Sequence, residues 1–181
     1  MGLTLGQPRI NEGSLPLLGA YGAQGLTDTR TAFGSLQLTG LLLGAVQLEG
    51  GVLNEVRPSQ GWRPGFSWTG AGHVLVSTRN ADVRFYPEAA GHIFWQQGPH
   101  IAHLSASTWI DPTFMLAEYD KGQLLAPNFG AGYRFRKGWF EAQIEYKILN
   151  PTRELIVPMS YVPGTNGVGG RGLYTGIALN F

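Results

Sequence analysis

The sequence predicts an all-β protein: an antiparallel up-and-down β-barrel that crosses a membrane, with eight strands expected and ten left open. Two patterned segments and the composition carry this prediction. Residues 171–181 alternate in hydrophobicity, and residues 128–149 form two alternating arms joined by a short turn. Charged residues make up 14% of the chain, against roughly 25% in ordinary soluble domains. A surface with so few charges indicates that something other than water covers much of it.

The C-terminal strand is the most regular of these segments. One of its faces is small or polar, and the other carries Leu173, Thr175, Ile177, Leu179 and Phe181. A patterned strand that continues to the last residue is typical of a strand that closes a barrel. The order of residue types also resembles the C-terminal recognition signal of bacterial outer-membrane barrels, through Tyr174, Gly176, Leu179 and Phe181.

The hairpin at 128–149 fixes the faces of two further strands. Its second arm alternates five apolar residues with four polar ones, Glu141, Gln143, Glu145 and Lys147. Facing lipid at mid-bilayer, Lys147 would cost roughly 2–4 kcal/mol, so we expect the polar face to line the lumen. A barrel of eight strands is filled by its own side chains, and these charges should therefore pair with each other and with Arg134.

The rest of the chain reads as further strands of one barrel domain covering residues 1–181. The clearest loop is 58–65, which has two prolines and two glycines, and 79–82 is a turn. Strands or pieces of strands are expected at 13–24, at two places within 31–55 that separate near Gly40 or Gly44, and at 66–78, 83–86, 92–96, 101–109 and 113–119. Side chains expected near strand ends, as in aromatic girdles, are Trp62, Trp68, Trp95, Trp109, Trp139 and Tyr133.

Charge and composition exclude several classes of protein. The net charge of +1 and the lack of a Lys/Arg cluster argue against nucleic-acid binding, and the absence of Cys excludes thiol chemistry and disulfides. A mean hydropathy of −0.05 and the lack of a run of about 18 apolar residues exclude a helical membrane protein. The first four residues lack a basic segment and a long apolar run, so we expect a mature form without its secretory signal.

A family resemblance follows from the same C-terminal segments. Residues 128–135 (Asn-Phe-Gly-Ala-Gly-Tyr-Arg-Phe), 144–151, 163–167 and the terminal strand resemble the outer-membrane lipid A deacylases, the acyloxyacyl hydrolase-like family. The resemblance covers roughly the C-terminal third and implies a barrel with a His-x-Ser-Asn motif, whose His and Ser act with a carboxylate as base and nucleophile on a lipid A ester. Here Lys147 stands at the His position and Leu149 at the Ser position, and only Asn150 is retained. The resemblance therefore implies the scaffold without its reaction.

Other candidate catalytic residues are few. His103 and Ser105 share a strand face, and Asp111 or Glu118 could complete a catalytic group with them. A hydrogen bond in the lumen explains such a pair equally simply. His92, His100 and His103 lack the close pairing with carboxylates that a metal site shows, so neither a metal nor a cofactor is expected.

The sequence thus predicts a small barrel of the bacterial outer membrane, in a Gram-negative type of envelope, acting as a scaffold, accessory or interaction protein. One alternative is a lipid A-modifying esterase, and a second is a soluble lipocalin-like ligand binder. The expected partners are outer-membrane lipid or lipopolysaccharide, the barrel assembly machinery during folding, and other envelope proteins.

Overall fold

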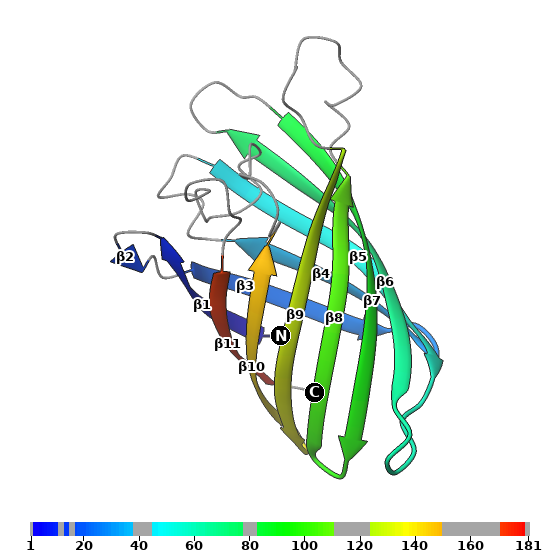
Figure 1. The fold of residues 1–181 in the computed structure, drawn as a ribbon. Coiled ribbons are helices and arrows are strands. Elements are labelled where there is room, and N and C mark those ends of the chain that lie inside the picture. The colour runs from blue at the N-terminus through cyan, green and yellow to red at the C-terminus, as the bar shows by residue number, and fades with distance from the viewer. Residues whose placement is uncertain are drawn as a thin grey trace.

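The computed structural model describes residues 2–10, 13–14, 17–37, 45–77, 83–110, 124–149 and 171–179, and all regular structure within them is β (Figure 1). No helix in this part of the chain is long and apolar enough to cross a membrane. The strands are β1 (Gly2–Ile10), β2 (Gly13–Ser14), β3 (Leu17–Gly25), β4 (Arg30–Gln37), β5 (Ala45–Arg57), β6 (Gly65–Ser77), β7 (Val83–Gln97), β8 (His100–Ile110), β9 (Leu125–Lys137), β10 (Phe140–Leu149) and β11 (Arg171–Leu179).

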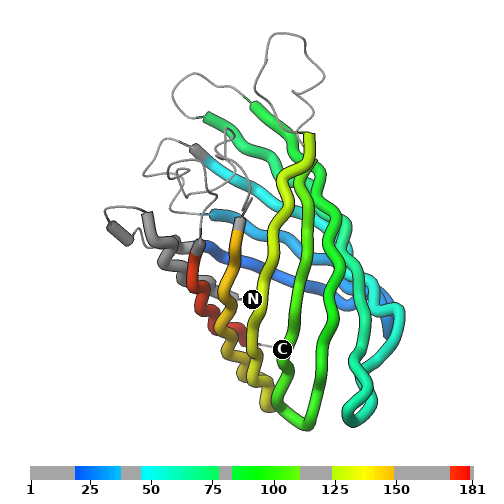
Figure 2. The backbone as a smooth tube through the Cα atoms, viewed as in Figure 1, coloured from blue at the N-terminus to red at the C-terminus, as the bar shows by residue number. Residues whose placement is uncertain are grey.

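The strands form one antiparallel sheet that closes on itself. Apart from the two-residue β2, strands adjacent in sequence are adjacent in the sheet, and β1 pairs with β11 from Gly2 opposite Ala178 to Arg9 opposite Arg171. Figure 2 shows the early strands crossing behind the late ones at a steep angle, as tilted barrel strands do. The predicted fold class, an antiparallel up-and-down barrel, is confirmed.

The strand number differs from the expected eight. Within the described ranges the ring has ten strands, β1 and β3–β11, while β2 only extends the edge of β1. One of the two additional strands arises at the N-terminus, where β1 precedes the segment expected to be the first strand. The pieces expected at 83–86 and 92–96 are one strand, β7, which runs through Pro87. The expected piece at 113–119 lies outside the described residues.

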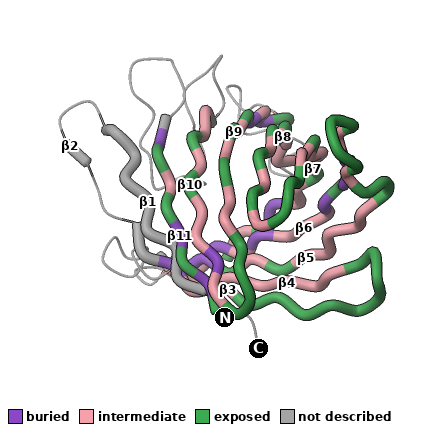
Figure 3. The backbone as a smooth tube through the Cα atoms, turned by 90° about the horizontal axis from the view of Figure 1, so that it is seen from below, coloured by how far each residue is buried: buried purple, intermediate pink, exposed green. Residues whose placement is uncertain are grey.

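The two faces of the ring have opposite character. Its outer face exposes large apolar side chains along every strand from β5 to β11, among them Leu48, Trp68, Phe85, Ile93, Leu104, Phe129, Ile144, Leu173 and Ile177. Its inner face buries polar side chains, namely Gln47, Ser67, Thr69, His73, Asn128 and Glu141. Figure 3 shows exposed and less exposed positions alternating along the strands. This arrangement is the reverse of a soluble β-protein.

The two ends of the ring also differ. Short turns join β3 to β4, β5 to β6, β7 to β8 and β9 to β10 at one end, and Gly61, Gly98 and Gly138 adopt positive φ of 57–59° in three of them. The start of β1 and the end of β11 lie at this same end of the barrel, because Leu179 pairs with Phe140 and Gly2 pairs with Ala178. Two of the connections at the opposite end, 111–124 and 150–170, are longer in sequence than any of these turns.

Candidate functional site

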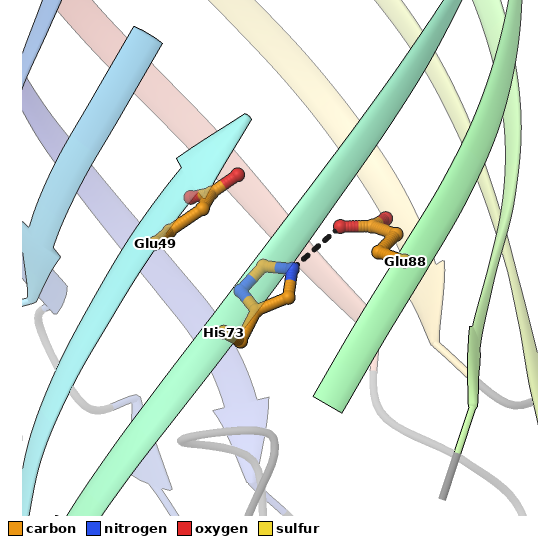
Figure 4. Close-up of side chains that lie close together, drawn as sticks. All are labelled: Glu49, His73 and Glu88. Atoms are coloured by element: carbon orange, nitrogen blue, oxygen red, sulfur yellow. Dashed lines mark hydrogen bonds and ion pairs between the residues drawn. The ribbon is translucent and has the colours of Figure 1, made fainter. Parts of the chain in front are cut away.

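Ionisable side chains gather at two places on the inner face of the barrel. The first group, the β5–β7 cluster, consists of Glu49 on β5, His73 on β6 and Glu88 on β7 (Figure 4). Glu49 lies directly opposite His73, and Glu88 lies diagonally opposite it, facing Ala71. The Nε2 atom of His73 is 2.7 Å from Oε2 of Glu88. One nitrogen and two carboxylate oxygens of the cluster all lie within 4.8 Å of one another.

Neighbouring side chains hold the β5–β7 cluster in place. Ser35 on β4 donates a hydrogen bond of 2.7 Å to Oε2 of Glu49. The amide nitrogen of Gln47 lies 3.4 Å from Nδ1 of His73, and the ring of Trp109 stacks on the imidazole at 3.9 Å between centroids. His73 is only 3% exposed. The imidazole is therefore fixed by contacts on both ring nitrogens and on one ring face.

The second group, the β8–β10 cluster, contains His103 and Ser105 on β8 and Glu145 and Lys147 on β10. Oε1 of Glu145 lies 3.5 Å from Nε2 of His103 and accepts a 3.5 Å hydrogen bond from the Ser105 hydroxyl. Nζ of Lys147 lies 3.2 Å from Oε2 of the same carboxylate. Glu145 is thus the centre to which the other three side chains point.

Two glycines on β9 make the β8–β10 cluster possible. Strand β9 runs between β8 and β10, and Gly130 and Gly132 occupy the positions between the interacting side chains. A Cβ atom at Gly132 would lie 2.7 Å from Nε2 of His103, and one at Gly130 would lie 2.7 Å from Oε1 of Glu145. Because β9 presents no side chain here, the groups of β8 and β10 can reach each other across it.

A further ion pair lies closer to the short turns. Nε of Arg134 on β9 is 3.4 Å from Oε1 of Glu141 on β10, and Glu141 is 7% exposed. Gln143, the remaining polar residue of this arm, lies opposite Arg134. The polar residues expected in the lumen thus form two separate groups, one around Glu141 and one around Glu145.

The C-terminal residues singled out from the sequence lie on both faces of β11. The ring of Tyr174 faces Lys147, whose Nζ is 5.4 Å from the ring centroid, and Gly176 is buried opposite Gln143. Leu179 is exposed on the outer face, and Phe181 lies outside the described residues.

The candidate His-Ser pair does not have the geometry of a nucleophile and its base. The described hydrogen bonds join His103 and Ser105 to Glu145 rather than to each other. Asp111 and Glu118, the expected third members, lie outside the described residues. Of the other histidines, His92 lies opposite Ser105 on the inner face and 2.9 Å from the hydroxyl of Thr69, whereas His100 contacts the Tyr133 hydroxyl.

Comparison with known proteins supports the fold and nothing finer. No protein-family model matches the chain, and no curated protein matches it. Among solved structures, the chain superposes on the NanC porin with a TM-score of 0.53 and 8% sequence identity, covering 99% of both chains. The chain has the barrel fold of a porin. Another match, OccK11 (OpdR) of Pseudomonas aeruginosa, has a TM-score of 0.37 at 7% identity over 99% of this chain and 64% of that one.

The likeness to the NanC porin shows the barrel fold and does not show the resemblance to the lipid A deacylases. Within the porin-type barrel, sequence reasoning missed the β5–β7 cluster entirely. Each of its members lies on the inward parity of its strand, but only the register of three strands brings them together. Trp109 was expected in an outer girdle and instead faces the lumen, because strict alternation along β8 puts it on the same face as Ser105.

Proposed function

We propose that the chain is an outer-membrane β-barrel whose lumen is constricted by its own paired side chains, and that it acts as a scaffold or accessory barrel rather than as a general diffusion pore. One observation carries this proposal: the outer face is apolar and exposed, while the inner face is polar, charged and largely buried. The same ring with the faces exchanged would be a water-soluble binding protein.

The apolar outer face favours a membrane over water. The side chains of Phe85, Phe129 and Ile177 are each at least half exposed, and they belong to three different strands. A lipocalin-like soluble barrel needs polar side chains at these positions, so the soluble alternative is disfavoured. Outer-membrane barrels have short turns on the periplasmic side and longer loops outside, which would place Gly61, Gly98 and Gly138 in the periplasm.

The inner face favours a narrow lumen. Barrels of about 8 strands are filled by their own side chains, and water-filled porin channels have about 16–18 strands, so a ring of ten is close to the filled limit. The Arg134–Glu141 and Glu145–Lys147 pairs hold charged side chains against the inner wall. Such pairs would narrow the path for solutes and for ions.

Electrical recording in planar bilayers tests the narrow lumen. We expect the wild-type barrel to show little or no steady conductance, and the double variant Arg134→Ala/Glu141→Ala to show more, because it removes two large side chains without leaving a lone charge. Arg63→Ala, at an exposed position in the β5–β6 turn, is the matched control and should behave as the wild type. Heat-modifiable gel migration verifies folding of each variant. A large ohmic conductance of the wild-type protein would contradict the proposal.

The esterase alternative makes a separate prediction. In the candidate dyad His103 must take the proton of the Ser105 hydroxyl, but that hydroxyl donates to Glu145, whose carboxylate also pairs with Lys147. Both His103 and Ser105 face the lumen, away from lipid. We therefore expect no loss of acyl chains from purified lipopolysaccharide incubated with the folded barrel. Acyl release that disappears in both His103→Ala and Ser105→Ala would establish the esterase instead.

The partners follow from the proposed location. The apolar outer face would contact the outer-membrane lipids, including lipopolysaccharide in the outer leaflet. The terminal pattern of Tyr174, Gly176, Leu179 and Phe181 would be recognised by the barrel assembly machinery before folding.

A further inference from the structure

We propose that Glu49, His73 and Glu88 form a lumenal binding site for a divalent transition-metal ion of the Zn²⁺ class. Imidazole nitrogen together with carboxylate oxygen is a donor set that Zn²⁺ accepts, and three protein ligands leave one position for water or a solute. The three side chains come from three adjacent strands and converge on one region of the inner wall (Figure 4). Metal binding by these three side chains depends neither on the membrane location nor on the conductance of the lumen.

The spacing of the donor atoms is close to that of a metal site. Ligand atoms about 2.0–2.1 Å from a tetrahedral Zn²⁺ are about 3.3 Å apart. The His73 and Glu88 donors are 2.7 Å apart, and the donor atoms of all three side chains lie within 4.8 Å of one another. Rotation of the Glu49 and Glu88 side chains about their own bonds can close the remaining gap. The backbone of the closed ring need not move.

The surroundings of His73 suit a metal ligand. A histidine that binds metal through one ring nitrogen normally donates a hydrogen bond from the other. Gln47 lies beside Nδ1 at 3.4 Å, and half a turn of its amide presents the carbonyl oxygen to accept that hydrogen bond. Nε2, which faces Glu88, would then bind the ion. Ser35 orients the Glu49 carboxylate in the same way, by donating to Oε2.

The β8–β10 cluster contains a lysine ammonium group beside its glutamate, and the β5–β7 cluster contains a second glutamate instead. In both, a histidine faces a glutamate, but at Glu145 the Lys147 ammonium group neutralises the carboxylate at 3.2 Å. In the β5–β7 cluster the additional group is a second carboxylate, Glu49. Lys147 also acts electrostatically on Glu88, but its ion pair is with Glu145, so two carboxylates beside one imidazole still form a negatively charged site that a divalent cation would balance.

Zinc binding to the folded, detergent-solubilised barrel tests the proposal, with Zn²⁺ alone as the probe in calorimetric titration. We expect one ion per wild-type barrel and at least about a 10-fold weaker affinity in Glu49→Gln and in His73→Gln, since loss of a ligand should cost no less than loss of its supporting contact. The matched control is His103→Gln, which removes the other lumenal histidine that faces a glutamate and should leave the affinity unchanged.

Glu49→Gln is the decisive variant because it keeps the His73–Glu88 contact and so should fold even if His73→Gln does not. Wild-type affinity in Glu49→Gln would overturn the proposal. So would an absence of Zn²⁺ binding to the wild type, or an equal loss in His103→Gln, which would place the ion elsewhere. The Zn²⁺ titrations test the metal site, and the bilayer conductance tests the proposed barrel function. Failure of one proposal is therefore distinguishable from failure of the other.

Discussion

Replacing Ile144 with Arg is expected to lower the free energy of unfolding of the barrel in a lipid bilayer by about 2–4 kcal/mol. Ile144 lies in the middle of β10, its side chain is 43% exposed on the outer face, and its partners across the neighbouring strands are Tyr133 and Thr175. If lipid surrounds this face, the guanidinium group must lose its water or deform the bilayer. The cost arises entirely from the solvent outside the barrel.

The same substitution separates a membrane barrel from a soluble one. On a water-exposed surface, a substitution such as Ile144→Arg usually changes stability by no more than about 0.5 kcal/mol. The matched control is Leu26→Arg, since Leu26 is also exposed, at 58%, but lies in the turn between β3 and β4, outside the strands. Denaturant unfolding in phospholipid vesicles measures both variants. Equal stability of Ile144→Arg and the wild type would contradict the membrane location.

Strand faces could be predicted because they depend on local alternation alone. In β10, polar and apolar residues alternate without a break, and the inward position of Glu141, Glu145 and Lys147 follows from it. In β7, the run Ala89-Ala90-Gly91 interrupts the alternation, so the sequence suggested two pieces where the structure has one strand. The strand β1 was missed for a similar reason, because its glycines and Pro8 obscure the period of two.

The two side-chain clusters differ in how far a single segment of sequence reveals them. Glu145 and Lys147 are two residues apart on one strand, so their proximity is visible in the sequence. The β5–β7 cluster is different, because Glu49 and His73 are brought together by the register between β5 and β6. The glycines of β9 were a signal that could have been used: a strand with two glycines on its inward face leaves room for side chains from both neighbours to meet.

Replacing Glu145 with Leu is expected to lower the free energy of unfolding by about 2–3 kcal/mol, below the roughly 3–5 kcal/mol for breaking a fully buried ion pair. The expected loss of stability is smaller than for a fully buried pair because the Lys147 side chain is 40% exposed, whereas Glu145 is 17% exposed. Without the carboxylate, the ammonium group remains in the lumen, and the His103 ring and the Ser105 hydroxyl lose the acceptor that they share. Gln143→Leu, which removes a neutral polar group from the same face of β10, is the control for the added apolar volume.

The double variant Glu145→Leu/Lys147→Met decides how the pair contributes. Replacing both members of a buried ion pair with apolar residues is often neutral or stabilising, so the double variant should be more stable than Glu145→Leu alone. Denaturant unfolding of the wild type, both single variants and the double variant completes the thermodynamic cycle. Destabilisation equal to the sum of the single effects would show that the two charges are not coupled. A double variant as stable as the wild type would mean that the pair adds no net stability, and that its role is to keep the lumen polar and narrow.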